Sequence, residues 1–91
     1  MNLEISFRHM EHTESIDKKI KEKLERFSKK HLSPSSNVSW TCLVEHNSHI
    51  ASCSISDGGK KYYVKAESDN MYKTIDQVLG KLEAQIVEHE H

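Results

Sequence analysis

The spacing of apolar residues changes along this chain, and that change constrains the fold more than any other feature. Near the N-terminus, Leu3, Ile5 and Phe7 alternate with polar residues, which predicts a half-buried strand. Thr13 is a candidate N-cap for the helix that follows. Its apolar stripe, at helical spacing, consists of Ile16, Ile20, Leu24 and Phe27.

Alternation then returns three times, and each time it is bounded by turn residues. A Pro- and Ser-containing loop over residues 31–36 precedes a strand from Val38 to Val44. A polar turn, Glu45 to Ser48, leads to a strand from Ala51 to Ile55. The turn at Asp57-Gly58-Gly59 leads to a strand from Tyr62 to Ala66.

A second helix closes the sequence, with Ser68 or Asp69 as its expected N-cap. Its stripe consists of Met71, Ile75, Val78, Leu79, Leu82 and Ile86. The order β-α-β-β-β-α predicts a parallel crossover between the first two strands and an antiparallel meander after it. We therefore expect an α+β fold over residues 1–91, a single domain with both helices on one face of a four-stranded mixed sheet.

Length and composition exclude several classes of protein. Ninety-one residues make one domain. No run approaches the roughly 20 apolar residues of a membrane span, and the N-terminus lacks the pattern of a signal peptide, so we expect a cytoplasmic protein. Two cysteines are too few for a disulfide scaffold. No nucleophile elbow, phosphate loop or paired-carboxylate motif is present, so we expect no enzyme and no cofactor.

The charge is unevenly distributed, although the net charge is −1. Residues 14–30 hold seven basic and four acidic residues, whereas residues 69–91 hold two basic and five acidic ones. On a helical wheel, the acids of the first helix lie away from one row of cations beside the apolar stripe. This row could track nucleic-acid phosphates, or it could be an ordinary solvated helix face. It consists of Lys19, Lys23, Arg26 and Lys30.

Four segments resemble one known family. Phe7 to Thr13 is similar to its first strand and helix start, and Val44-Glu45 also fits. Lys65 to Asp76 resembles its signature at the second helix, with Met-Tyr and Ile-Asp, and Lys81 to Ile86 resembles the pattern that closes the domain. The family is that of the short ribosome hibernation factors, also described as sigma-54 modulation or S30EA-type ribosomal proteins.

The resemblance implies a fold like that of double-stranded-RNA-binding domains and a stress or stationary-phase role. A member would dock on the RNA of the small ribosomal subunit, in the channel for mRNA and tRNA, and would inhibit translation. A short member is expected to be a monomer without membrane contact, and to need a second hibernation factor to pair ribosomes. The candidate RNA contacts are Lys19, Lys23, Arg26, Lys30 and Lys81, with Arg8 at the end of the first strand.

The sequence departs from the family pattern at positions that are usually basic. Ala84, Glu88 and Glu90 stand in or near the expected C-terminal basic run, and His46 replaces an expected hairpin lysine. Because histidine is charged only near or below its pKa, binding is expected to strengthen as the pH falls toward about 6. The alternative is a diverged protein-interaction or sigma-54-modulation module with weak or no ribosome binding.

Two further groups of residues allow other interpretations. His9, His12, His46 and His49 are expected at one end of the sheet, where they could ligate zinc or be unrelated surface residues. Cys42 and Cys53 would face each other if the intervening turn centred between Asn47 and Ser48. Otherwise they are two buried thiols that act as small apolar residues.

Overall fold

The predicted element order is present in the computed structural model, which describes residues 1–89 and, for His89, the backbone alone. The bounds of the helices and strands are β1 Asn2–Arg8, α1 Glu14–His31, β2 Asn37–Glu45, β3 Ser48–Asp57, β4 Lys60–Ser68 and α2 Met71–His89. Each predicted strand and helix lies within an observed one. The first helix extends one residue further than expected, because His31 belongs to α1 rather than to the following loop.

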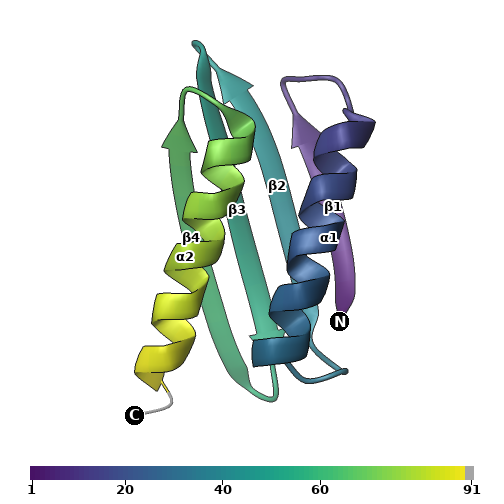
Figure 1. The fold of residues 1–91 in the computed structure, drawn as a ribbon, viewed down its shortest axis with the longest axis vertical. Helices are drawn as coiled ribbons and strands as arrows, with labels where there is room; N and C mark the ends of the chain where they lie inside the picture. Colours follow the sequence, from purple (N-terminus) through teal and green to yellow (C-terminus); the bar gives the residue numbers. More distant parts are fainter. Residues whose placement is uncertain (90–91) are drawn as a thin grey trace.

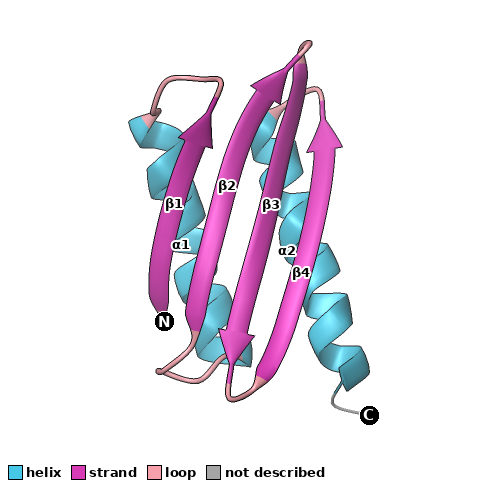
Figure 2. Cartoon of the chain, turned by 180° about the vertical axis from the view of Figure 1, so that it is seen from behind, coloured by secondary structure: helices cyan, strands magenta, loops and turns pink. Residues whose placement is uncertain are grey.

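The four strands form one sheet in the order β1-β2-β3-β4. β1 pairs with β2 in parallel, while β2, β3 and β4 form the antiparallel meander, so the predicted topology is confirmed. Both helices lie on the same face of the sheet (Figure 1), and the opposite face is left uncovered (Figure 2). Neither helix of residues 1–89 is long and apolar enough to cross a bilayer.

The core lies between the helices and the covered face of the sheet. The apolar stripe of α1 is buried, as are the stripe residues of α2 apart from the half-buried Leu79. Trp40 and Tyr62 point inward from β2 and β4, and they are 1% and 6% exposed. The inward-facing side chains are less buried in β1 than in the other strands, and Leu3, Ile5 and Phe7 are only half-buried. The sheet ends at β1, so one side of these residues has no neighbouring strand.

The β2–β3 hairpin has a two-residue loop, His46-Asn47. Both residues have positive φ, at 50° and 64°, as a tight hairpin turn of matching twist requires. The turn therefore centres one residue earlier than the position that would oppose the cysteines. Cys42 pairs with Ala51, and Cys53 pairs with Trp40. Both cysteines are buried and free, and they are not cross-strand partners.

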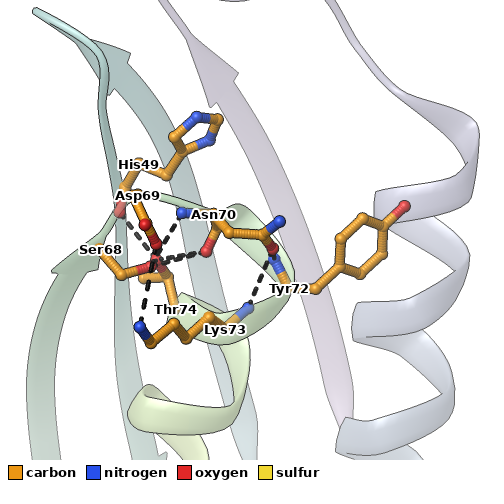
Figure 3. A network of polar contacts seen from close by, with 7 residues as sticks. All are labelled: His49, Ser68, Asp69, Asn70, Tyr72, Lys73 and Thr74. Carbon is orange, nitrogen blue, oxygen red and sulfur yellow. Dashed lines mark hydrogen bonds and ion pairs between the residues drawn. The ribbon is translucent and has the colours of Figure 1, made fainter.

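The N-terminus of α2 is capped by Asn70, and the expectation of Ser68 or Asp69 was wrong. The Asn70 side-chain oxygen accepts hydrogen bonds from the main-chain N–H groups of Tyr72 (2.9 Å) and Lys73 (3.3 Å). Asn70 immediately precedes α2, so its side chain reaches these otherwise unpaired donors (Figure 3). Ser68 instead accepts from the Asn70 N–H at 3.2 Å.

Thr74 ties this cap to the sheet. It is fully buried, and its hydroxyl can donate to the main-chain carbonyl of His49 at 2.8 Å or of Asn70 at 3.1 Å. The Ser68 hydroxyl lies 2.6 Å from the same oxygen. Figure 3 shows these groups converging where α2 begins, with Tyr72 pointing away toward α1. The network joins β3, β4 and α2 at one buried point.

The start of α1 is held differently from the expected cap. Thr13 occupies the N-cap position, but its side chain makes no capping hydrogen bond and contacts the Glu11 carbonyl at 3.4 Å. His12 Nε2 lies 2.7 Å from Asp17 Oδ2. This hydrogen bond lowers the pKa of the Asp17 carboxyl, and Lys21, 3.1 Å away, adds to the effect.

Candidate RNA-binding surface

The cation row predicted on the first helix lies on the flank of α1 that faces α2. Arg26 and Lys30 line an open groove of about 230 Å³ between the C-terminal halves of the helices, and Lys23 lies at the same groove. Lys19 stands one turn before Lys23 on the same flank and is half-buried. The structure therefore gathers these four predicted residues along one line.

One member of the row is neutralised by the other helix. Lys23 Nζ donates a hydrogen bond to Asp76 Oδ1 of α2. Asp76 is 62% exposed and Lys23 is 34% exposed, so this ion pair sits at the surface. Nearer the start of both helices, the Ser15 and Tyr72 hydroxyls lie 3.0 Å apart. These two contacts bridge the helices above the groove.

The remaining cations of the row are available to a ligand. Within residues 1–89, Lys19, Arg26 and Lys30 form no ion pair. On the other flank, Lys21 contacts Asp17 and Lys29 lies 3.8 Å from Glu25, and among the described residues Lys18 alone of that flank's lysines forms no ion pair. Unpaired cations attract phosphates without first losing a protein partner. The row is therefore the strongest candidate anion-binding feature of α1.

The groove below this row has an apolar floor and a rim of mixed charge. Phe27 of α1 and Leu79 of α2 form the floor, and the Phe27 ring lies 4.8 Å from the His31 ring. Glu83 of α2 stands on the rim among the cations. Glu83 repels phosphate, so the α1 side of the groove is the more favourable side for RNA.

Lys81 lies apart from this row. Its ammonium group donates to the main-chain carbonyl of Lys65 at 2.8 Å, at the outer edge of β4. It lines a separate hollow with Glu67 and Gln77, on the flank of α2 that faces away from α1. The prediction that Lys81 binds RNA therefore concerns a second surface.

Arg8 lies on a third surface. It is exposed at the last position of β1, in register with Leu43 of β2. The inward-facing residues of β1 alternate with it, so its side chain belongs to the uncovered face of the sheet. One flat partner could not contact Arg8 and the α1 row together, whereas a folded RNA that wraps the domain could.

The positions that depart from the family pattern are exposed. His46 stands at the tip of the β2–β3 hairpin, and Ala84 and Glu88 lie on the exposed side of α2. Glu90 lies outside the described residues. Beyond Lys81, the charged side chains that the structure describes on α2 are Glu83 and Glu88, and both are acidic and exposed.

The four histidines considered for zinc do not form a site. Among the described side chains, those of residues 1–88, no three His, Cys, Asp or Glu residues lie close enough to hold a metal ion. His12 is engaged with Asp17, and its ring also contacts Phe7 edge-on at 4.8 Å. The main-chain carbonyl of His49 accepts from Thr74.

Sequence reasoning missed two acids of α2 near the α1 row, Glu83 on the groove rim and Asp76 as the partner of Lys23. Asp76 and Glu83 come from α2, whereas the row was judged acid-free from α1 alone. Asp76 follows Tyr72 by four residues, so both lie on the same helix flank. That shared flank is a signal in the sequence, but the partners, Ser15 and Lys23, depend on how the helices pack.

Comparison with known proteins gives a family and a fold. The family model described as sigma 54 modulation protein / S30EA ribosomal protein matches residues 3–91. A ribosomal subunit interface protein from Coxiella burnetii has a similar structure, with a TM-score of 0.86 and 23% identity, and the match covers 99% of this chain and 98% of that one. The N-terminal domain of Protein Y from Thermus thermophilus matches with a TM-score of 0.84 and 22% identity, over 94% of this chain and 96% of that one. At these identities the structures establish the fold alone, and no curated protein matches.

Proposed function

The chain belongs to the sigma 54 modulation protein / S30EA ribosomal protein family, whose members are non-enzymatic factors, and we propose that it is a ribosome hibernation factor. In this proposal it docks on the RNA of the small ribosomal subunit, in the channel that mRNA and tRNA use. Occupying that channel inhibits translation. The protein acts in the cytoplasm during stress or stationary phase.

The observation that carries the proposal is the presence of three unpaired cations in the α1 row. Lys19, Arg26 and Lys30 share one flank and have no acidic partner among residues 1–89. The described residues around them offer no platform of exposed aromatic rings for stacking bases. Contacts with backbone and shape are therefore favoured, which suits structured RNA.

The other predicted contacts have subordinate roles in this proposal. Lys23 contributes when RNA phosphate competes with Asp76 for its ammonium group. Lys81 and Arg8 meet RNA segments on the β4 edge and on the open sheet face, respectively. Pairing of ribosomes requires a second hibernation factor.

Co-sedimentation with purified small subunits across a salt series tests the proposal. Wild-type protein should pellet at low salt and dissociate steeply as salt rises, because each phosphate contact releases counterions. The variant Arg26→Glu/Lys30→Glu should lose pelleting. The matched control Lys18→Glu/Lys29→Glu makes the same change in net charge on the flank that faces away from α2. It should pellet nearly as wild type does.

The outcomes separate the proposal from its alternative. Equal losses in both double variants would indicate a general charge effect rather than docking through the α1 row. Absence of pelleting by the wild type at low salt would favour a protein-interaction or sigma-54-modulation module. Apolar docking to a protein partner would depend only weakly on salt.

A further inference from the structure

The two edge strands of the sheet, β1 and β4, differ in whether other groups of the protein hydrogen-bond to their outer main-chain atoms. At the β4 edge, Lys81 donates to the Lys65 carbonyl at 2.8 Å, and Gln85 donates to the Tyr63 carbonyl at 3.0 Å. The two donors are four residues apart on α2, and the two acceptors alternate along the strand. α2 therefore occupies acceptors that an added strand would need.

The β1 edge has no such cover. The Asn2 N–H donates to the Ser36 carbonyl at 2.8 Å, on the side of β2. Main-chain groups point alternately to the two sides of a strand, so those of Leu3, Ile5 and Phe7 point away from β2. Within residues 1–89, no group hydrogen-bonds to this outer edge. Figure 2 shows β1 as the outermost strand.

Apolar surface accompanies these free groups. Leu3, Ile5 and Phe7 are half-buried because the sheet stops beside them. An open groove of about 510 Å³ runs between the start of β1 and α1, with Met1 and Leu3 among its lining residues. Its α1 side carries both signs of charge, at Lys21 and Glu25. A strand laid along β1 would cover this surface and pair the free main-chain groups.

The exposed charges of β1 indicate which strand fits. Glu4 and Arg8 lie on the uncovered face, four residues apart. Consider β1 of a second copy placed antiparallel to this β1, with the two Ser6 residues opposite each other. Glu4 of each copy then lies opposite Arg8 of the other copy. The same register places Ile5 opposite Phe7 of the second copy, and both residues have main-chain groups that face the edge. Opposite charges that face each other directly stabilise a strand pair. A pair centred on Glu4 or on Arg8 would instead place two identical charges opposite each other, which is destabilising.

We propose that the free edge of β1 docks a second copy of this chain, antiparallel and centred on Ser6, which joins two four-stranded sheets into one. The contact is isologous, because each copy contributes the same residues. It leaves the α1 row open, since that row faces α2. In this proposal the chain is a dimer, whereas the family resemblance implies a monomer, and dimerisation is independent of RNA binding.

A cysteine at the symmetry axis tests the geometry directly. Directly opposed residues in a pair without main-chain hydrogen bonds between them have Cα atoms about 4.5 Å apart, within disulfide range. Oxidised Ser6→Cys protein, without RNA, should therefore run as a covalent dimer under non-reducing conditions. The control Ser54→Cys places an exposed cysteine on the same sheet face, away from the edge, and should stay monomeric. No covalent dimer from Ser6→Cys, or equal dimer from both variants, would overturn the proposal.

A charge exchange tests the register without a cross-link. Sedimentation velocity over a concentration series should show wild-type dimer, loss of it in Glu4→Arg and in Arg8→Glu, and its return in Glu4→Arg/Arg8→Glu. A wild type that stays monomeric at every concentration would overturn the proposal. The β1 edge would then be a docking site for a strand of a different protein, if for any. Single variants that dimerise as wild type does would overturn it too. Small-subunit binding, measured separately, reports on the proposed function alone.

Discussion

Lys23 of α1 donates a hydrogen bond to Asp76 of α2, although 53 residues separate them in sequence. The pair bridges the two helices beside the groove that Arg26 and Lys30 line. It holds one cation of the α1 row in place and offsets its charge. Asp76 therefore limits how strongly this surface can attract an anion.

Replacing Asp76 by Asn should strengthen RNA binding. Lys23 is then free to contact phosphate, and the plot of log affinity against log salt should steepen by about 0.7 to 0.9 for the added contact. Stability should change by less than about 1 kcal/mol, because exposed ion pairs contribute little. Titration with small subunits at several salt concentrations measures both affinity and slope. The control Asp69→Asn removes an acid that lies 3.9 Å from Lys73, at the start of α2, and an equal effect there would exclude a specific role for Asp76.

Replacing Thr74 by Val should destabilise the fold. The change keeps the shape of this fully buried side chain but removes the hydroxyl that serves the carbonyls of His49 and Asn70. Loss of one partner from a buried hydrogen bond costs about 1–3 kcal/mol. Urea denaturation should show a lower midpoint with an unchanged slope. Thr41→Val, on the uncovered sheet face, is the matched control, and a similar loss there would argue against the buried network.

Asp57 should make stability fall in acid. Hydrogen bonds from the Ser33 hydroxyl and then from the Ser33 main-chain N–H lower the pKa of the Asp57 carboxyl in the folded state. A group with a lowered folded pKa stabilises the protein above its unfolded pKa, and this stabilisation is lost as the pH falls through the folded pKa. In Asp57→Asn, unfolding free energy should therefore depend less on pH below about pH 5 than in the wild type. Urea titrations at several pH values measure this, with Asp69→Asn as control. Parallel pH profiles for wild type and Asp57→Asn would contradict the prediction.

Both native cysteines should be inert in the folded protein. Burial raises the pKa of the Cys42 thiol to about 11 and that of Cys53 to about 12. The thiolate is the reactive form, so a thiol reagent near neutral pH should modify neither residue until the protein unfolds. Colorimetric thiol titration with and without urea measures this. The Ser54→Cys variant should react with one equivalent in its native state. Rapid modification of native wild-type protein would show that the core opens near these residues.

The sequence predicted the fold well because periodicity reports directly on burial. The stripe from Ile16 to Phe27 and the alternation from Val38 to Val44 both match buried faces. The α1 row was also placed on one flank, since a helical wheel depends on spacing alone. Whether these cations bind RNA stays a prediction, because spacing does not report on affinity.

Features that depend on local competition or on distant packing could not be predicted in the same way. Ser68, Asp69 and Asn70 are all good caps, and only the place where α2 begins decides among them. The cysteine register changed with a one-residue shift of the hairpin turn to His46-Asn47. The pairing of Lys23 with Asp76 requires knowledge of how two helices meet, which no local pattern contains.

The parallel pairing of β1 with β2 also determines the order in which the sheet can be assembled. Asn2 pairs with Asn37, so 34 residues lie between the two ends of this contact, whereas the hairpins β2–β3 and β3–β4 each close over two residues. Closing the longer loop costs more chain entropy, so we expect the meander to form first and β1 to join it late. During synthesis, β1 and α1 leave the ribosome before β2, the strand that pairs with β1, has emerged. The newly made chain therefore carries an unpaired strand with one apolar face for as long as β2 takes to emerge.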